Sequence, residues 1–406
     1  MAAYVIVGAS LAGATAAMTL REEGADGPVT LIGAEQEAPY ERPPLSKAYL
    51  RGDTPFDKAL VRPLAFYADH DIRTMFGTRV IRVDPSERIV ELEDHRRVPF
   101  DALLIATGGR NRQMSVPGSD LQGIYGLRTV RDADRIRKEI VPGRRVVVVG
   151  MGFIGSEVAA SLRQKGLDVV AISPSKTPLF RPLGEAVGQT IADLHRSHGV
   201  RTIFEDTVVA FEGTRRVATV VTRKGLRLEC DFVVVGIGLE PAVGMLADSG
   251  ILLHNGVVVD EYCRTSVRGI YAAGDVANHY HPVFERQLRV EHWHNAVKQG
   301  AAAARNMLGR SVTYDEVHWF WSDQYKANLQ YAGFHTTWQQ LVVRGRLDSA
   351  SYLACYVNDG RIDAVVGLNR AKDVRRVMPL IKARRAVDLE QLRDEHVDLR
   401  TLDVRP

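Results

Sequence analysis

The chain has 406 residues, of which 45% are hydrophobic, and it carries a formal net charge of +4 at pH 7. This length predicts roughly two to three domains with enough apolar side chains for their cores. The charge is too small to favour nucleic acid as a partner, and no apolar stretch approaches the ~20 residues that span a bilayer. Since the sequence enters a β-branched run without a charged and apolar leader, we expect a cytoplasmic protein.

The cysteines and histidines show no spacing that is typical of a metal or redox site. Cys230, Cys263 and Cys355 lie far apart and form no Cys-x-x-Cys or Cys-x4-Cys pair. This pattern argues against a dithiol relay, a structural zinc and a cysteine-held iron–sulfur cluster, so we predict three small buried apolar residues. The twelve histidines form no His-x-x-x-His pair on an evident helix face, and we predict no metal ligands among them.

The first predicted element is a short buried strand, Tyr4–Val7, which leads into a glycine-rich turn and then an Ala-rich helix over 14–21. The turn consists of Gly8, Ala9, Ser10, Leu11, Ala12 and Gly13. A strand, turn and helix of this kind present backbone N–H groups and a positive helix end to a pyrophosphate. Ser10 stands where such turns have their middle glycine, and its small side chain must point away or bond the phosphate.

Glu35 follows the next predicted strand, over 29–33, and lies 35 − 13 = 22 residues past the last glycine of the turn. This is near the ~20-residue spacing of a carboxylate that binds an adenosine ribose. We therefore predict a ribose-binding role for Glu35; the alternative is a solvated loop glutamate.

Two later strands, over 102–105 and 232–235, each run into a glycine turn. The first continues as Ala106, Thr107, Gly108 and Gly109, and the second as Gly236, Ile237 and Gly238. One lies before and one after a second glycine-rich turn. We interpret them as the two crossings between an outer domain and an inserted one.

The second glycine-rich turn follows the strand over 145–149 and precedes a helix predicted over 156–164. It consists of Gly150, Met151, Gly152, Phe153, Ile154 and Gly155, and it has all three glycines. The strand after that helix runs into Ser173, Pro174, Ser175 and Lys176. No carboxylate stands there for an NAD ribose and no arginine for a 2′-phosphate, so this region leaves the coenzyme open.

A further predicted strand, over 269–273, ends at Gly274 and Asp275, where a carboxylate is well placed to bond ribityl or phosphate groups of a flavin nucleotide. Further on, Glu291, His292 and Trp293 precede a helix predicted over 296–308.

With these motifs the chain resembles the two-dinucleotide flavoprotein reductases. The shared motifs are Gly8 to Gly13, Glu35, Ala106 to Gly108, Gly150 to Glu157 and Ala272 to Ala277. The segments Pro39 to Lys47 and Trp319 to Tyr325 narrow the resemblance to ferredoxin reductases of the putidaredoxin reductase and biphenyl dioxygenase reductase type. It covers essentially the whole chain, and rubredoxin reductases and apoptosis-inducing factor are wider relatives.

The resemblance implies an α/β fold with two Rossmann-like dinucleotide-binding domains and a C-terminal α/β reductase domain. The FAD-binding domain would comprise residues 1–109 and 237–313, the inserted NAD(P)H-binding domain residues 110–236, and the C-terminal domain residues 314–406. The chain departs from the family pattern at Ser10, at Ser173 and at Ala242, where relatives often have asparagine. These departures affect the predicted coenzyme preference rather than the predicted flavin.

The resemblance also implies two catalytic residues. Lys47 follows the rigid Pro43–Pro44 pair and would lie near flavin N5, paired with Glu157 from the second turn. A cation there stabilises the charge of reduced flavin, and Glu157 could bond the nicotinamide carboxamide. The alternative is an exposed lysine and a helix-surface glutamate. Arg42 would contact an FAD phosphate.

Two tryptophans complete the predicted flavin contacts. The helix start at Trp293 would direct N–H groups at the N1/O2 edge of the flavin, and Trp321 would lie near its dimethylbenzene rim. For both, packing in a core is the alternative. The other predicted cofactor-binding residues are Leu11, Ala12, Pro44, Ala106, Thr107, Gly108, Phe153, Ile154, Lys176, Gly238, Glu291 and His292.

The implied function is an NAD(P)H:ferredoxin oxidoreductase, with NADH favoured over NADPH. FAD would take a hydride and deliver single electrons to an acidic [2Fe–2S] ferredoxin that feeds a cytochrome P450 or a ring-hydroxylating dioxygenase. A rubredoxin reductase, a small-acceptor NADH oxidase and a redox-sensing flavoprotein like apoptosis-inducing factor are the alternatives. Two basic surfaces could receive the ferredoxin: Lys298, Arg305 and Arg310, or the run from Arg370 to Arg385.

Overall fold

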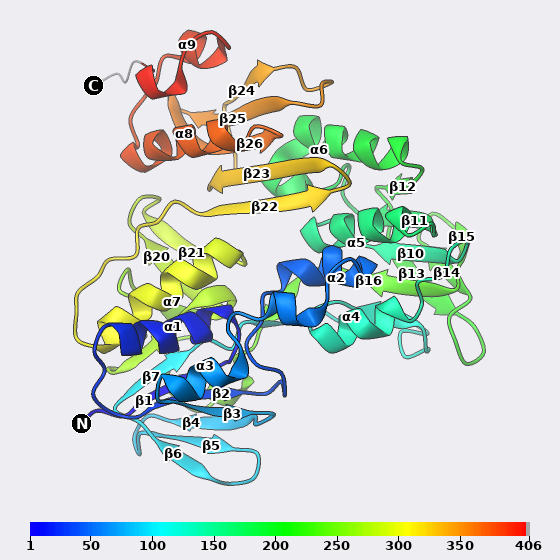
Figure 1. Ribbon diagram of the computed structural model, residues 1–406. Coiled ribbons are helices and arrows are strands. Elements are labelled where there is room, and N and C mark those ends of the chain that lie inside the picture. Colours follow the sequence, from blue (N-terminus) through cyan, green and yellow to red (C-terminus); the bar gives the residue numbers. More distant parts are fainter. Residues whose placement is uncertain (403–406) are drawn as a thin grey trace. The chain divides into compact units, whose positions relative to one another are not determined.

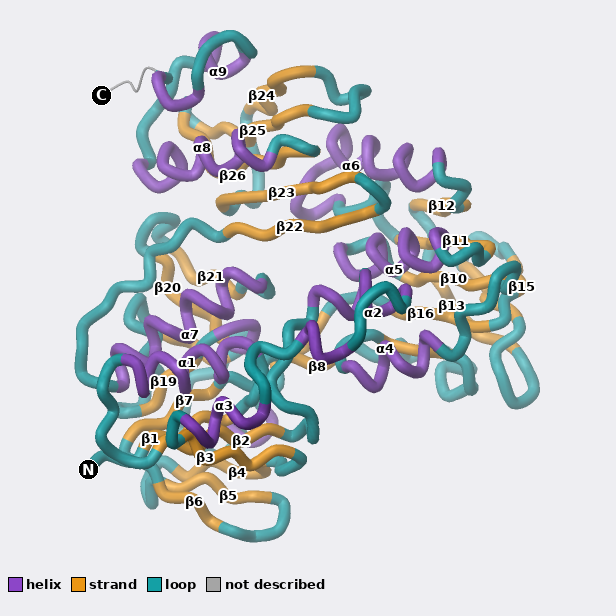
Figure 2. The backbone as a smooth tube through the Cα atoms, viewed as in Figure 1, coloured by secondary structure: helices purple, strands orange, loops and turns teal. Residues whose placement is uncertain are grey.

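The computed structural model describes residues 1–402 and divides into two compact units, each assembled from three pieces of chain (Figures 1 and 2). Unit 1 comprises Met1–Glu41, Phe56–Arg110 and Glu240–Trp319. Unit 2 comprises Arg42–Pro55, Asn111–Leu239 and the chain from Phe320 onward. The first glycine-rich turn belongs to unit 1 and the second to unit 2.

Unit 1 is built on a parallel sheet in the order β19-β7-β1-β2-β3. The strands are β19 (Ile270–Ala272), β7 (Ala102–Ile105), β1 (Tyr4–Val7), β2 (Val29–Gly33) and β3 (Ile72–Phe76). Helices α1 (Leu11–Glu22) and α7 (Trp293–Met307) lie side by side (Figure 1). Their close approach requires Gly300, because a Cβ there would lie 2.5 Å from the carbonyl oxygen of Ala12.

Two small sheets and one short helix complete unit 1. One sheet has the order β4-β5-β6, with β4 (Val80–Asp84), β5 (Ile89–Leu92) and β6 (Arg97–Pro99). The other has the order β18-β20-β21, with β18 (Val257–Val259), β20 (Ala277–His281) and β21 (Arg286–Arg289). Helix α3 spans Leu64–Asp69.

The nucleotide-binding part of unit 2 has a second parallel sheet, in the order β12-β11-β10-β16-β9. Its strands are β12 (Arg201–Phe204), β11 (Asp168–Ser173), β10 (Arg145–Val149), β16 (Phe232–Val235) and β9 (Ile124–Gly126). An antiparallel sheet contains β13 (Val208–Glu212), β14 (Thr219–Thr222) and β15 (Arg227–Glu229). The helices are α2 (Ala48–Arg51), α4 (Val130–Arg137), α5 (Phe153–Gln164) and α6 (Phe180–Ser197).

The C-terminal part of unit 2 has a five-stranded sheet in the order β22-β23-β26-β25-β24, with α8 (Ala371–Ala383) against it and α9 (Leu389–Arg393) after it. The strands are β22 (Trp319–Gln324), β23 (Ala327–Gly333), β26 (Arg361–Leu368), β25 (Tyr352–Asn358) and β24 (Gln340–Gly345). Apolar side chains of α6, such as Leu183 and Ile191, share one core with Tyr352 and Tyr356 of this sheet. The burial of this shared core holds the C-terminal sheet on the nucleotide-binding part.

Two parallel Rossmann-like sheets and a C-terminal antiparallel sheet with its helices confirm the predicted fold class. The short strands β8 (Gly109–Asn111) and β17 (Leu239–Pro241) lie where the chain passes between the units, and they pair with each other. Helices α1, α5 and α7 each begin about three residues before the predicted start, because the turn residues themselves take helical conformations. The division into three domains stays a prediction.

Candidate functional site

The first glycine-rich turn brings backbone N–H groups to the start of α1. Gly8 has φ +116°, and a Cβ there would lie 2.2 Å from the carbonyl oxygen of Ala106. A Cβ on Gly13 would lie 1.9 Å from the carbonyl oxygen of Gly8. Ser10 is the N-cap residue, yet its side chain makes no capping hydrogen bond. The first N–H groups of the helix, including those of Leu11 and Ala12, have no partner inside the helix and can bind an anion.

Glu35 lies just after β2 and is half-buried. The hydroxyl of Tyr40 donates a hydrogen bond to Glu35 Oε2. The carboxylate of Glu35 is therefore held in place at the end of β2, the strand next to β1. This is the position that the 22-residue spacing predicts for a ribose-binding acid. Tyr40 is a supporting residue that sequence reasoning missed, although it lies in the Pro39 to Lys47 segment.

The exit of β7 packs tightly against the same turn. Ala106 is buried, and its N–H donates to the carbonyl of Val7 at 2.8 Å. The Thr107 hydroxyl donates to the carbonyl of Ala242 at 2.8 Å, and Gly108 turns the chain with φ +64°. The Thr107 hydroxyl is therefore engaged with the backbone. We expect Thr107 to contact a cofactor through its main-chain atoms.

Gly274 and the start of α7 form the third part of this region. Gly274 has φ +78°, its N–H donates to Gln299 Oε1 at 2.8 Å, and Asp275 follows in a short 3₁₀ turn. His292 is the N-cap of α7 and Trp293 is its first residue. His292 makes no side-chain capping bond, and the first N–H groups of a helix have no partner inside the helix. Glu291 instead pairs with Arg289 at 2.6 Å.

The second glycine-rich turn repeats this design in unit 2. Gly150 has φ +95°, and a Cβ there would lie 2.3 Å from the carbonyl oxygen of Gly236. A Cβ on Gly155 would lie 1.8 Å from the carbonyl oxygen of Gly150. A Cβ on Gly152 would meet no atom within 4 Å, and Ile154 beside it is 43% exposed. The turn is thus tight on its inner side and open above the helix start, as a bound pyrophosphate requires.

Lys47 and Glu157, predicted as a pair, are in contact. Lys47 Nζ donates to Glu157 Oε2 at 2.6 Å and to the carbonyl of Pro43 at 3.2 Å. Glu157 lies in α5 and is 3% exposed, and the Lys47 side chain is 12% exposed. A buried carboxylate needs a cation and further donors to offset its lost hydration. Pro43 and Pro44 open the 3₁₀ turn that delivers Lys47 to this position.

Two serines complete the bonds to Glu157, and sequence reasoning missed both. Ser46 Oγ donates to Glu157 Oε2 at 2.5 Å, and Ser322 Oγ donates to Oε1 at 2.7 Å. Ser46 is adjacent to Lys47, whereas Ser322 comes from β22 of the C-terminal sheet. The available signal was the Trp319 to Tyr325 motif, in which Ser322 directly follows the second tryptophan.

The polar side chains at the end of β11 are engaged within the protein. Ser173 is buried and its Oγ accepts a bond from the N–H of Ser175 at 3.3 Å. Lys176 Nζ pairs with Glu185 Oε2 at 3.0 Å. This hydrogen bond, with the charge of Glu185, raises the pKa of Lys176. Lys176 is therefore already engaged with a carboxylate.

The remaining predicted residues of unit 2 lie on loops, at the start of α5 and on β22. Arg42 donates through Nη1 to the carbonyl of Arg128. Gly238 has φ +100° and its carbonyl accepts the N–H of Arg112 at 3.0 Å. Trp321 is half-buried, on the opposite face of β22 from the buried Ser322. Phe153 packs on Phe320 of the same strand with ring centroids 4.4 Å apart.

The three cysteines are buried and free, as predicted. Burial raises the pKa of Cys230 and of Cys355 to about 12, and it raises that of Cys263 as well. Thiols of this kind stay protonated and unreactive at neutral pH. They therefore take no part in a redox relay.

Comparisons with known proteins agree with this geometry. Residues 2–300 match the family model described as pyridine nucleotide-disulphide oxidoreductase, and residues 319–403 match the one described as reductase C-terminal. In the part of the chain that the structure describes, no helix combines the length and apolarity needed to cross a membrane.

Individual relatives match over nearly their whole length. Rhodocoxin reductase of Rhodococcus erythropolis is 38% identical over 98% of this chain and 93% of its own. The ferredoxin–NAD(+) reductase component of the anthranilate 1,2-dioxygenase system of Burkholderia cepacia is 39% identical over 98% of both chains. The reductase in a crystal structure of a covalent putidaredoxin reductase–putidaredoxin complex has a TM-score of 0.95 and 33% identity, covering 98% of this chain and 97% of its own. The chain therefore belongs to the pyridine nucleotide-disulphide oxidoreductases and, within them, to the ferredoxin reductases of the putidaredoxin reductase type, an oxidoreductase family for electron transfer.

Proposed function

We propose that this protein is a cytoplasmic, FAD-containing ferredoxin–NAD(+) reductase that oxidises NADH and reduces an acidic [2Fe–2S] ferredoxin. One observation carries the proposal: the chain has two separate strand, glycine-turn and helix cradles, one in each unit, as transfer between two dinucleotides requires. The relatives named above serve dioxygenase and rhodocoxin or putidaredoxin systems, so the ferredoxin would feed a ring-hydroxylating dioxygenase or a cytochrome P450.

The residues of unit 1 fit FAD. Gly8 and Gly13 admit the close approach of backbone that a pyrophosphate needs, and the N-terminal N–H groups of α1 supply its donors. Glu35, oriented by Tyr40, would accept hydrogen bonds from the ribose hydroxyls. Asp275 would accept from ribityl hydroxyls, and the start of α7 would donate to the flavin edge where charge accumulates.

The residues of unit 2 fit NADH. The pyrophosphate would be received in the open space at Gly152, next to the exposed Ile154. The engagement of Lys176 by Glu185 favours NADH over NADPH, because a carboxylate next to that lysine repels a 2′-phosphate.

Bound FAD supplies the hydride acceptor and the step from two-electron to one-electron transfer. The protein holds the reacting groups and excludes water. In this proposal, Lys47 presents a fixed positive charge where negative charge develops on reduction, and Glu157 holds its ammonium group in place. Each NADH gives two electrons and one proton overall, so two ferredoxins are reduced per turnover.

Anaerobic stopped-flow spectroscopy of the purified protein tests this function. We expect a yellow protein whose flavin band bleaches faster with NADH than with NADPH and recovers on addition of an oxidised [2Fe–2S] ferredoxin. A colourless protein that cannot be reconstituted with FAD contradicts the proposed cofactor. A flavin that is reduced by NADH but passes electrons only to rubredoxin or to oxygen contradicts the proposed partner.

A further inference from the structure

Three histidines meet in the interior of unit 1. His279 and His281 lie on β20, and His318 directly precedes β22. Their side chains are at most 1% exposed. One ring nitrogen from each lies within 4.8 Å of those of the other two. The spacing His279-x-His281 with a distant third histidine gave no motif in the sequence, so this cluster is visible only in the fold.

The backbone explains why the three side chains converge. Alternation along β20 puts His279 and His281 on one face and the exposed Tyr280 on the other. Antiparallel pairing with β21 fixes this register. The segment that brings His318 is anchored by Tyr314, whose hydroxyl donates to Asn295 Oδ1 at 2.7 Å.

The distance between two of the rings fits a shared metal ion. His279 Nε2 and His318 Nε2 are 3.3 Å apart. Two nitrogens bound tetrahedrally to one zinc at ~2.0–2.1 Å lie about 3.3 Å from each other.

The third ring is oriented as metal-binding histidines commonly are. His281 Nε2 lies 3.0 Å from the carbonyl oxygen of Glu316. Because a carbonyl oxygen only accepts, Nε2 carries the proton and Nδ1 carries the lone pair. Backbone carbonyls frequently fix the tautomer of a metal-binding histidine in this way.

We propose that His279, His281 and His318 bind one divalent transition-metal ion, with zinc as the best match to three buried imidazoles, two of which already have the nitrogen–nitrogen distance of a tetrahedral site. Since the site is buried, no substrate reaches it, and its role is structural. It ties β20 to the segment that leaves unit 1. This assignment replaces the sequence-based expectation of no metal ligands, and it does not depend on the proposed electron-transfer activity.

Metal analysis of the flavin-loaded, tag-free protein tests the site. Elemental analysis of protein grown with zinc should find about one zinc per chain. X-ray absorption at the zinc edge should show only nitrogen and oxygen ligands at ~2.0–2.1 Å, without sulfur. Added Co²⁺ should give absorption bands at longer wavelength than the flavin, and a chelator should lower the melting temperature.

Two variants and one control locate the site. His318→Gln and His281→Gln should each lose most of the zinc, while His254→Gln, an exposed histidine of the same unit, should keep it. A flavin-loaded wild-type protein that is free of metal and gains neither zinc nor Co²⁺ overturns the proposal and leaves a hydrogen-bonded cluster of neutral rings. Equal zinc content in wild type and both variants places the metal elsewhere and overturns it too.

Discussion

Ser322 donates a hydrogen bond to Glu157 Oε1 at 2.7 Å, although the two residues lie 165 positions apart. With Ser46 and Lys47 on Oε2, both oxygens of the buried carboxylate are engaged. The C-terminal sheet therefore contributes directly to the geometry of the nucleotide-binding turn. This contact gives the C-terminal domain a role in the proposed active site as well as in stability.

Replacing Lys47 by Met should slow reduction of the flavin by NADH by on the order of 10²–10³, or about 3–4 kcal/mol, because one preorganised charge is lost. Glu157→Gln should slow it as well, with little effect on FAD content. Stopped-flow absorbance measures both. Lys138→Met, an exposed lysine at the end of α4, is the control and should behave as wild type. Unchanged rates in both variants would make the pair purely structural.

Ser322→Ala should also slow reduction of the flavin by NADH, but less than Lys47→Met does. A hydrogen bond to a charged group contributes about 1.5–3 kcal/mol, so we expect flavin reduction to slow at least several-fold. As a positioning residue, Ser322 should change the rate of reduction more than the KM for NADH. Ser322→Thr keeps the hydroxyl and should restore most of the rate. Equal loss in Ala and Thr variants would point to packing instead.

The coenzyme preference depends on Glu185. Glu185→Gln removes the carboxylate that engages Lys176 and should raise kcat/KM for NADPH several-fold relative to NADH, because the lysine can then meet a 2′-phosphate. The double variant Lys176→Met, Glu185→Gln should lose this gain. Ser173→Glu should favour NADH further. A wild-type enzyme that already prefers NADPH strongly would contradict the proposed coenzyme.

The stability of unit 2 should fall at mildly acid pH because of His195. Burial lowers its pKa to about 4, while its ring contacts Gln324 Oε1 at 2.9 Å. Between its unfolded pKa of ~6.5 and about 4 the unfolded chain binds more protons, so stability is lost as the pH falls, by on the order of 3 kcal/mol. His195→Gln should flatten the melting temperature between pH 7 and 4.5, whereas the exposed His198→Gln should not. If the melting temperatures of the wild type and both variants fell in parallel with pH, groups other than His195 would control the acid sensitivity.

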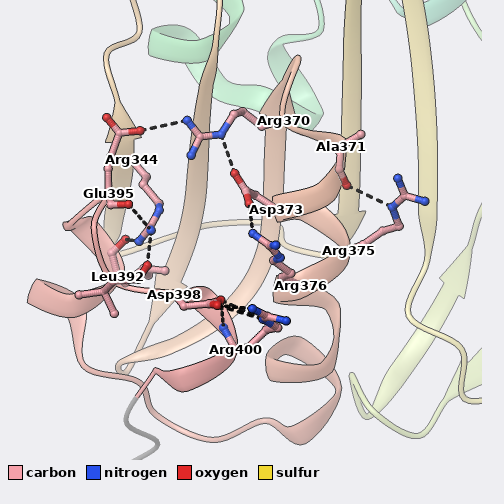
Figure 3. A network of polar contacts seen from close by, with 11 residues as sticks. Arg344, Arg370, Ala371, Asp373, Arg375, Arg376, Leu392, Glu395, Asp398 and Arg400 are labelled. Atoms are coloured by element: carbon pink, nitrogen blue, oxygen red, sulfur yellow. Dashed lines mark hydrogen bonds and ion pairs between the residues drawn. The ribbon is translucent and has the colours of Figure 1, made fainter.

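Ion pairs distinguish the two candidate docking surfaces for the ferredoxin. Arg305 and Arg310 both pair with Glu23, which offsets one of their two charges and leaves Lys298 as the further exposed cation of this surface. On α8, Arg370 and Arg376 pair with Asp373 (Figure 3), whereas Lys372 and Arg375 are exposed. We therefore favour α8 as the surface that steers an acidic partner.

Charge reversal tests this preference. The double variant Lys372→Glu, Arg375→Glu should lower ferredoxin reduction strongly at low salt and weakly at high salt, while ferricyanide reduction stays normal. The control is Arg135→Glu, Lys138→Glu, an equally spaced pair of exposed cations at the C-terminal end of α4. An equal loss in both double variants would indicate net charge alone, and a loss with both acceptors would indicate a damaged active site.

The strands and glycine turns could be predicted from the sequence because local patterns determine them. The strands before Gly8 and Gly150 are short buried runs, and the turns need glycine because a Cβ would collide with backbone. The contact of Lys47 with Glu157 followed from family resemblance rather than from spacing. The Lys176–Glu185 ion pair was missed because α6 has a kink at Gly184, which sets where Glu185 lies.

Contacts between distant segments could not be predicted in this way. Ser46 and Ser322 look like ordinary loop and strand serines until the C-terminal sheet is packed on α6. The same holds for the His279, His281 and His318 cluster, because its members become neighbours only when β20 meets the segment before β22. Such sites depend on tertiary packing, which leaves no periodicity in the sequence.

The interleaved order of the two units has a consequence for biosynthesis. Strand β7 pairs with β19, and Leu103 lies opposite Ile270 in this pair. The sheet of unit 1 therefore cannot be complete until Ile270 has been synthesised. Unit 2 in turn needs the chain beyond Phe320 to cover the apolar side of α6. Most of the chain must therefore be translated before either unit can fold completely. Until then the nascent chain exposes an unpaired strand and an open core, which are features that favour aggregation, so truncation before Phe320 should yield an insoluble product.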